Sequence, residues 1–364
     1  MTLKYRRKLF FISIAGFLII TPAVLLYTAG YRLADDWSLA KTGGIYISSP
    51  LSGSEIFIGN DLKKQTNLLQ SGVFVQNLRP SVYSALVAKE DYWPWQKNLK
   101  IEPQLVAEAR AFLVPRSPEG KTLMRGPFIS VFASPFNEIL ILEELEGKTK
   151  KIVFYLPDSG EFLTNASIST NKILSFSQKI NDVYPVKSSE TEFNGVDFNE
   201  KQTALLFLSN NSFLKTEFDF ENKTVRASSA PALEYLAAEN EDIKLSRRFV
   251  RFDKQKKLKI WLEKDDEIWT EWLEKNSPLP FYLSTEKEMV IKTRSPIKNI
   301  DFFPSRKDVL IFAAENGVFA LEIDGRSNRN MQPIYKGLNP TFSVSSSQKI
   351  VYILDDGALS KIEL

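Results

Sequence analysis

The sequence predicts a mainly β protein that follows a single apolar N-terminal helix. Three observations lead to this expectation. An uncharged apolar run fills residues 9–31. Period-2 alternation of apolar and polar residues begins near Gly43. A motif built on an aromatic residue then recurs after residue 130. The 364 residues suffice for about two domains at ~150 residues each, and an aromatic content of 12% with 26 Phe favours strand-rich cores.

The run from Leu9 to Tyr31 predicts a membrane-spanning helix. Its 23 residues would cover roughly 34 Å as a helix, against about 30 Å of hydrocarbon in a bilayer. Cations before the run hold the N-terminus in the cytoplasm, and aromatic rings after it suit the opposite interface. The predicted anchor residues are Lys4, Arg6, Arg7 and Lys8 on the inner side, and Tyr27, Tyr31 and Trp37 on the outer side.

Two other interpretations of this run remain open. A cleaved signal peptide has the same charged start, and Thr28 and Gly30 are small enough for a cleavage site, although its apolar core usually spans only about 7–15 residues. A buried core helix is the other, but the run is apolar on all faces. A membrane helix also tolerates Pro22 better than a soluble helix does.

The composition excludes most familiar catalytic sites. The chain has no His and no Cys, which removes Ser-His-Asp triads, Cys nucleophiles, disulfides and the usual zinc sites. No glycine-rich phosphate-binding motif occurs. When the four N-terminal cations are left out, the chain has 43 basic and 44 acidic residues. It therefore has no excess of basic residues that would hold a nucleic acid. We therefore expect no enzyme activity, no cofactor, no metal and no nucleic-acid partner.

Residues 43–103 are predicted to form a small β domain, joined to the helix segment (residues 1–31) by a linker at residues 32–42. Isoleucines alternate with polar or small residues at 45–47 and again at 56–58, with turn residues between the two runs. A unit of this size buries only a small core. Its aromatic residues, including Trp93 and Trp95, are expected to supply much of that burial.

Several short stretches of this segment combine turn and core residues: Ser49-Pro50, Glu55-Ile-Phe-Ile58, Gly59-Asn60, Leu78-Arg-Pro-Ser-Val-Tyr83, Leu86-Val87 and Asp91-Tyr-Trp-Pro-Trp95. Through these stretches the segment resembles a PEGA domain, a small β-sandwich-like module of bacterial surface proteins. The family pattern has Gly where Ser81 and Asp91 stand in this chain. The resemblance implies a two-sheet fold and work at the cell surface, and it is silent on the ligand.

Residues 127–364 contain a repeated motif: an aromatic residue, a polar turn of about five residues, and a four-residue apolar strand. The mean spacing of six copies is 42 residues, within the range of propeller blades. The repeat resembles a TolB-type or other degenerate β-propeller and predicts about five or six blades. A β-sandwich or a solenoid is the alternative. The copies begin at Phe132, Ile168 (a weaker copy), Phe198, Phe252, Phe302 and Phe342.

Two segments complete this organisation. Residues 104–126 are predicted to be a connector, and a strand from residues 110–130 is expected to close the last blade against the final strand of the chain. Residues 231–239 are expected to form a helical insertion, with Ser229 as a possible cap.

Two pairs of residues are candidates for a binding surface. Trp93 and Trp95 can stack on a sugar, although core packing is the alternative. Arg247 and Arg248 begin a basic run and can contact an anionic polymer or lipid, although a solvated blade edge explains the run as well; it continues with Arg251, Lys254, Lys256 and Lys257. The acidic pairs of the chain, such as Asp355-Asp356, suit hairpin turns better than catalysis or calcium binding.

The sequence as a whole predicts a membrane-tethered extracytoplasmic protein of the bacterial cell envelope that binds or scaffolds without catalysis. Its expected partners are the lipid bilayer, through the helix, and an envelope protein or cell-wall polymer. The first alternative is an envelope glycan hydrolase or lyase that uses carboxylates on the propeller. The second is a passive spacer.

Overall fold

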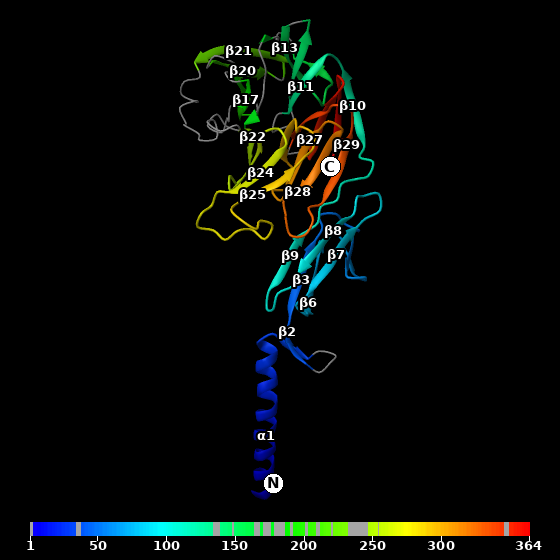
Figure 1. Ribbon diagram of the computed structural model, residues 1–364, viewed down its shortest axis with the longest axis vertical. Helices are drawn as coiled ribbons and strands as arrows, with labels where there is room; N and C mark the ends of the chain where they lie inside the picture. The colour runs from blue at the N-terminus through cyan, green and yellow to red at the C-terminus, as the bar shows by residue number, and fades with distance from the viewer. Residues whose placement is uncertain are drawn as a thin grey trace. The chain divides into compact units, whose positions relative to one another are not determined.

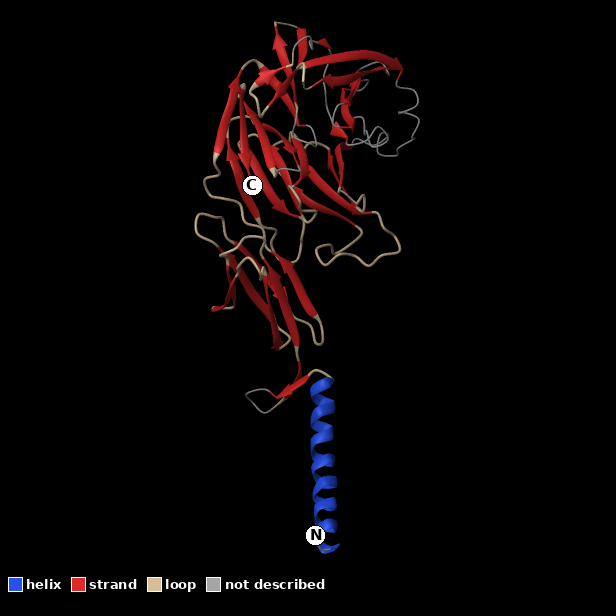
Figure 2. Ribbon diagram, turned by 180° about the vertical axis from the view of Figure 1, so that it is seen from behind, coloured by secondary structure: helices blue, strands red, loops and turns tan. Residues whose placement is uncertain are grey.

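The computed structural model has two compact units (Figure 1). Unit 1 consists of Met1–Leu113 with Arg326–Asn328, and unit 2 of Val114–Gly325 with Arg329–Leu364. Strands dominate the described structure after the first helix (Figure 2). The structure describes residues 3–33, 38–133, 139–147, 149–163, 168–169, 176–177, 186–189, 192–200, 203–208, 212–219, 221–231, 247–253, 255–345 and 349–364.

Helix α1 (Leu3–Thr28) contains the predicted anchor. Its segment Tyr5–Thr28, 24 residues, is long and apolar enough to cross a membrane, and its apolar stretch is not buried inside the protein. The helix ends three residues before Tyr31, where the uncharged run ends. Gly30 takes a positive φ of 82°, which helical residues do not adopt, and so the chain turns there.

The predicted linker at residues 32–42 contains a short hairpin instead of irregular chain. Strand β1 (Tyr31–Leu33) pairs antiparallel with β2 (Leu39–Lys41). Tyr31 therefore starts a strand and does not end the helix. Two strands of three residues each are too short to show a clear period-2 alternation of apolar and polar residues. The sequence pattern therefore did not predict this hairpin.

The small β domain of unit 1 consists of two sheets. The first has the order β6-β3-β9, with β3 and β9 parallel, and the second has the antiparallel order β5-β4-β7-β8. Each sheet buries alternate residues, such as Ile45 and Ile47 in β3 and Ile56 and Ile58 in β4, as the two-sheet expectation requires. The strands are β3 (Gly43–Ser48), β4 (Glu55–Ile58), β5 (Asp61–Gln65), β6 (Gly72–Leu78), β7 (Val82–Ala88), β8 (Trp95–Lys100) and β9 (Val106–Arg110).

The predicted connector at residues 104–126 holds two strands. Strand β9 belongs to the small domain, because it pairs with β3, and β10 (Gly120–Arg125) belongs to unit 2. The prolines that suggested a connector, Pro115 and Pro118, lie between these strands, and Gly120 is the first residue of β10. The irregular stretch is therefore shorter than the sequence suggested.

Unit 2 contains five sheets among the described residues, which we call blades 1 to 5, and their strands pair antiparallel except for the parallel pair of β16 and β18. In each blade the first strand pairs with the second and the second with the third. Blade 1 consists of β11 (Phe128–Ala133), β12 (Leu140–Glu146), β13 (Thr149–Leu156) and β14 (Glu161–Phe162), and β15 (Ile168–Ser169) pairs with β13. Blade 2 consists of β18 (Glu192–Glu200), β19 (Thr203–Leu208), β20 (Ser212–Asp219) and β21 (Thr224–Pro231), and β16 (Phe176–Ser177) and β17 (Val186–Ser189) pair with β18.

Blade 3 consists of β22 (Arg247–Phe252), β23 (Leu258–Glu263), β24 (Glu267–Trp272) and β25 (Lys287–Lys292). Blade 4 consists of β26 (Asn299–Phe302), β27 (Val309–Ala314), β28 (Gly317–Glu322) and β29 (Met331–Lys336). Blade 5 consists of β30 (Thr341–Ser345), β31 (Ile350–Asp355), β32 (Ala358–Glu363) and β10.

The repeat seen in the sequence corresponds to the first hairpin of each blade. The five strong aromatic anchors lie in or at the end of the first strands, and the apolar run of each copy forms the second strand. The weaker copy at Ile168 lies in β15, which adds to blade 1 and does not begin a sheet. The described residues therefore form five blades, within the predicted range.

The ring is closed by the strand pair that the sequence predicted. Strand β10 pairs antiparallel with β32, so that one sheet contains the first strand and the last strand of unit 2. At the end of this pair, the Gly126 N–H donates to the Gly357 carbonyl at 2.9 Å. A Cβ on Gly357 would lie 2.3 Å from the carbonyl oxygen of Gly126, so only glycine fits this close approach.

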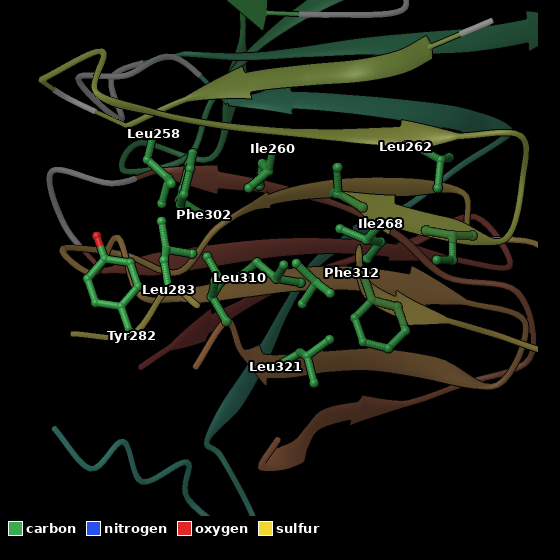
Figure 3. Packing of buried hydrophobic residues seen from close by; sticks show 14 of the residues in the cluster. Leu258, Ile260, Leu262, Ile268, Tyr282, Leu283, Phe302, Leu310, Phe312 and Leu321 are labelled. Carbon is green, nitrogen blue, oxygen red and sulfur yellow. The ribbon is translucent and has the colours of Figure 1, made fainter. Parts of the chain in front are cut away.

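Two apolar cores hold neighbouring blades face to face. In the core between blades 3 and 4, Leu258, Ile260 and Leu262 of β23 face Leu310 and Phe312 of β27 (Figure 3). A second core joins blades 5 and 1, with members such as Tyr352 of β31 and Leu140 of β12. Packing of sheet on sheet around the ring is the arrangement of a β-propeller.

The expected helical insertion at residues 231–239 is not tested. Pro231 ends β21, and residues 232–246 lie outside the described residues.

Candidate functional site

The first strands of blades 3, 4, 5 and 1 lie next to one another at the inner edge of the propeller. Strand β26 contacts both β22 and β30, and β30 also contacts β11. These four strands come from blades 3, 4, 5 and 1, so residues far apart in the sequence meet at one edge. We call this region the inner edge.

A charged pair, Arg251 and Asp301, links blades 3 and 4 at the inner edge. The Arg251 Nε lies 3.8 Å from the Asp301 Oδ2. The other oxygen of Asp301 accepts the Phe302 N–H at 2.7 Å. The Asp301 side chain keeps 32% of its surface accessible, so the pair lies deep among protein atoms but still in contact with water.

The surroundings of this pair shift the pKa of both groups. Burial raises the pKa of the Asp301 carboxyl, and the charge of Arg251 opposes that shift. Burial also lowers the pKa of Arg251, while the charge of Asp301 acts in the other direction. Each charge therefore stabilises the other in a place where water cannot fully solvate either.

Polar side chains continue the inner edge from blade 4 to blade 1. The Asn299 Nδ2 donates to the Phe342 carbonyl at 2.6 Å, and the Ser343 Oγ accepts the Ala133 N–H at 2.9 Å. Each contact joins two neighbouring blades. The Asn299 Oδ1 and the Thr341 Oγ1 are buried and have no hydrogen-bond partner among the described residues.

This arrangement can recognise a ligand, but the described part of it offers little for catalysis. A cation, a carboxylate, an amide oxygen and a hydroxyl lie along adjacent strands, and each of these four groups is able to form a hydrogen bond with a ligand. In the sequences of β11, β22, β26 and β30, Asp301 is the only acidic residue, so these strands do not supply the two carboxylates that glycoside hydrolysis requires.

The two tryptophan candidates differ in burial. Trp95 is fully buried in the small domain, as core packing requires, and is therefore not part of an exposed binding surface. Trp93 is half-buried in the turn before β8. Successive strand residues point to opposite faces, and Trp95 lies on the same face of β8 as buried Leu99, which explains its burial.

Arg247 and Arg248 lie at the start of β22, the first strand of blade 3. The structure does not describe their side chains, so their role stays a prediction. Arg251, in the same basic run, lies at the inner edge and not on a solvated blade edge.

The predicted anchor residues lie as follows. Arg6, Arg7 and Lys8 are exposed in the first turns of α1, and Tyr27 is exposed in its last turn. The side chain of Lys4 is not described, and Trp37 lies outside the described residues.

The acidic pairs Asp265-Asp266 and Asp355-Asp356 lie at hairpin turns, as predicted, whereas Glu143-Glu144 lies within β12. Asp355 ends β31, and its carboxylate accepts the Leu338 N–H at 3.0 Å and the Asn339 N–H at 2.9 Å. It therefore fixes the loop between β29 and β30. Among the described residues, no group of three or more acidic side chains is placed to hold a metal ion.

Sequence reasoning missed Asn299 and Asp301, although the repeat contains a signal for the inner edge. The residue directly before each strong aromatic anchor lies on the first strand of its blade. In four blades this residue is polar: Asp197, Arg251, Asp301 and Thr341, of which the last three lie at the inner edge. Aligning the repeats on the aromatic anchor would have placed these side chains together.

Sequence comparison assigns no family to the chain: no protein-family model matches it, and no curated protein matches it. The β-propeller domain of Cps50 (Swd1) from Myceliophteria thermophila is similar over 68% of this chain and 100% of that chain, with 9% identity and a TM-score of 0.37. A luciferin-regenerating enzyme is similar over 68% of this chain and 96% of that chain, with 8% identity and a TM-score of 0.38.

TolB from Acinetobacter baumannii is similar over 77% of this chain, but only 59% of that chain is covered, with 13% identity and a TM-score of 0.29. Likenesses at such TM-scores carry no argument about function. The propeller assignment rests on the sheet order and the closure of this chain itself.

Proposed function

We propose that this protein is a non-catalytic, membrane-tethered binding protein of the bacterial cell envelope, and that it takes its ligand at the inner edge of the propeller. The observation that carries the proposal is the set of polar groups on β22, β26 and β30, with Arg251 and Asp301 at its centre. The ligand is an envelope protein or a cell-wall polymer, since both carry the amide, hydroxyl and charged groups that this edge complements.

The N-terminal helix supports the proposed tether. Lys4, Arg6, Arg7 and Lys8 precede the apolar span, and no acidic residue lies among them. By the positive-inside rule, the N-terminus stays in the cytoplasm and the two β units stand outside. The small domain, which we propose to be PEGA-like, then lies between the membrane and the propeller in the chain.

The two alternative functions make different predictions. A glycan hydrolase needs a second carboxylate facing Asp301, and the described strands β11, β22, β26 and β30 contain no other acidic residue. A passive spacer needs no polar inner edge, yet Asn299 and Thr341 keep buried oxygen atoms without partners in the described structure. Such atoms are costly unless a ligand or water satisfies them, which favours binding.

The experiment is a retention assay with the full-length protein in nanodiscs. Isolated peptidoglycan and solubilised envelope proteins serve as separate baits. We expect the wild type to be retained by one bait and the double variant Arg251→Gln with Asp301→Asn to lose most of that retention. The double change removes both charges together and leaves no single buried charge.

The matched control is Lys361→Ala, which removes one member of an ion pair on β32. Its retention is expected to equal that of the wild type, with circular dichroism confirming that both variants are folded. If the wild type binds neither bait, the passive spacer replaces the present proposal.

A further inference from the structure

Exposed apolar side chains gather at one end of the small β domain. Val82 starts β7, Leu105 lies just before β9 and Val106 starts β9; they are 62%, 57% and 52% exposed. The register places them at the same end, because Val82 pairs with Lys100 in β8 and Val106 pairs with Gly44 in β3. We call this the helix-proximal end and define it as residues 78–82 and 100–106.

The helix-proximal end forms direct hydrogen bonds with the residues that follow α1. The Gln104 Nε2 donates to the Ala29 carbonyl at 2.9 Å, and the Thr42 N–H donates to the Gly30 carbonyl at 3.0 Å. Carbonyls at the C-terminus of a helix have no partner within the helix. Here the β domain supplies the partners, so no free spacer separates the helix from the domain.

Arg32 strengthens the same junction. Its Nη1 donates to the Tyr27 carbonyl at 2.8 Å, and its Nε donates to the Asn77 Oδ1 at 2.9 Å. The guanidinium carbon also lies 3.6 Å from the centre of the Tyr27 ring. Asn77 and Gln104 also reach this junction through their side chains, and both have positive φ, at 61° and 64°. Such strained backbone persists where the surrounding structure requires it.

Helix length then places this end of the domain in the lipid headgroup layer. The 24-residue span covers about 36 Å, which exceeds the ~30 Å hydrocarbon core but not the ~40–45 Å of core plus headgroups. Ala29 follows the span directly and therefore lies among the headgroups. Gln104 is one hydrogen bond away from Ala29, and Leu105 is its neighbour in the chain.

The charges at the junction fit this layer. Arg32 lies over Tyr27, and the Lys41 Nζ lies 5.3 Å from the centre of the Tyr31 ring. Tyrosine rings favour the membrane interface, and a cation beside each ring lies at the depth of the headgroup phosphates. Lys41 is exposed, so its ammonium group is accessible to an anion.

We propose that the helix-proximal end is itself a membrane-contacting surface. Val82, Leu105 and Val106 enter the interfacial layer of the same bilayer that holds α1, and Arg32 and Lys41 contact headgroup phosphates. The inference rests on the part of the proposed function that places α1 in a bilayer. It adds that the small domain stands on the lipid and is not held away from it.

Nitroxide labels on single cysteines test the proposal, because the chain has no cysteine of its own. Val82→Cys and Leu105→Cys report on the surface, in full-length protein in phosphatidylcholine–phosphatidylglycerol nanodiscs. Leu69→Cys is the control at the opposite end, where Ser48 pairs with Gly72, and its side chain is 95% exposed. Gly16→Cys reports on the middle of α1, where nothing lies within 4 Å of an added Cβ.

The readout is the collision rate of each label with a water-soluble nickel chelate and with oxygen, which concentrates in lipid. We expect labels 82 and 105 to collide with the nickel chelate severalfold less than label 69. If labels 82, 105 and 69 collide with the nickel chelate at the same rate while label 16 collides with it rarely, the proposal is overturned and the membrane anchor stands. Nickel collision at label 16 as high as at label 69 would overturn the anchor and the proposal together.

Charge reversal tests the phosphate contact. In the variant that carries the label at position 105, the additional substitution Lys41→Glu is expected to raise the collision rate of that label with the nickel chelate. Lys89→Glu is the matched control, since it follows β7 at the opposite end and also lies beside a tyrosine ring, that of Tyr92. An identical effect of the two reversals would contradict a specific role of Lys41.

Discussion

Substitution of Gly357 tests whether the pairing of β10 with β32 closes the propeller. Gly357 has a φ of 69°, and left-handed backbone costs a residue with a Cβ about 1–2 kcal/mol. The new Cβ would also lie 2.3 Å from the Gly126 carbonyl oxygen, so the two turns must move apart. Their hydrogen bond, worth about 1 kcal/mol net, is then weakened or lost. We expect Gly357→Ala to lower the free energy of unfolding by about 2–3 kcal/mol.

Gly147→Ala is the matched control for this change. Gly147 also has a positive φ, 64°, in a turn of blade 1, but nothing lies within 4 Å of an added Cβ. Only the conformational cost of about 1–2 kcal/mol applies there.

The assay is thermal unfolding of the full-length protein in detergent, followed by tryptophan fluorescence. For a unit of this size, each kcal/mol shifts the midpoint by about 2–4 °C, so Gly357→Ala should unfold several degrees below Gly147→Ala. Equal midpoints for the two variants would refute the reasoning, because the contact across the closure would then contribute nothing.

Three further predictions concern the core, the charges and the topology. Trp95→Ala should destabilise unit 1 by about 3–5 kcal/mol, because it removes a large buried side chain. Trp93→Ala should lower the free energy of unfolding clearly less, and denaturant unfolding of the two variants measures the difference. The Lys292 ammonium group, followed by the Trp269 and Lys264 side chains, lowers the pKa of Glu267 from 4.5 to about 2. The stability that this carboxylate contributes is therefore complete above about pH 4.5 and is lost as the pH falls towards 2. The difference in unfolding free energy between the wild type and Glu267→Gln should shrink over that range, and a constant difference would contradict the lowered pKa. Finally, protease added outside intact cells should degrade the β units, and full protection would contradict the proposed orientation.

Much of the fold was predictable because its signals are local. The apolar run of α1 is contiguous, and each blade repeats the same aromatic residue, turn and apolar strand. The closing strand was also predictable, since a blade that lacks an outer strand at one end of a repeat array needs one from the other end. The small hairpin β1–β2 was not, because it is shorter than any periodic pattern.

The candidate site was less predictable, because it depends on convergence. Arg251 and Asp301 are 50 positions apart in the chain, and neither belongs to a motif. Sequence reasoning assigned Arg251 to a solvated run of cations and did not single out Asp301. Only the contact between β22 and β26 at the inner edge brings their side chains within 3.8 Å.

The sequence by itself determined the apolar helix, the β character of the remaining chain and the repeat that builds the blades. These features follow from hydrophobic periodicity and turn residues, which act over a few neighbouring positions. The tertiary structure alone decided the number of blades, the polar groups that meet at the inner edge, and the direct junction between α1 and the small domain. Those outcomes depend on contacts between residues distant in the chain, and a local pattern contains no information about them.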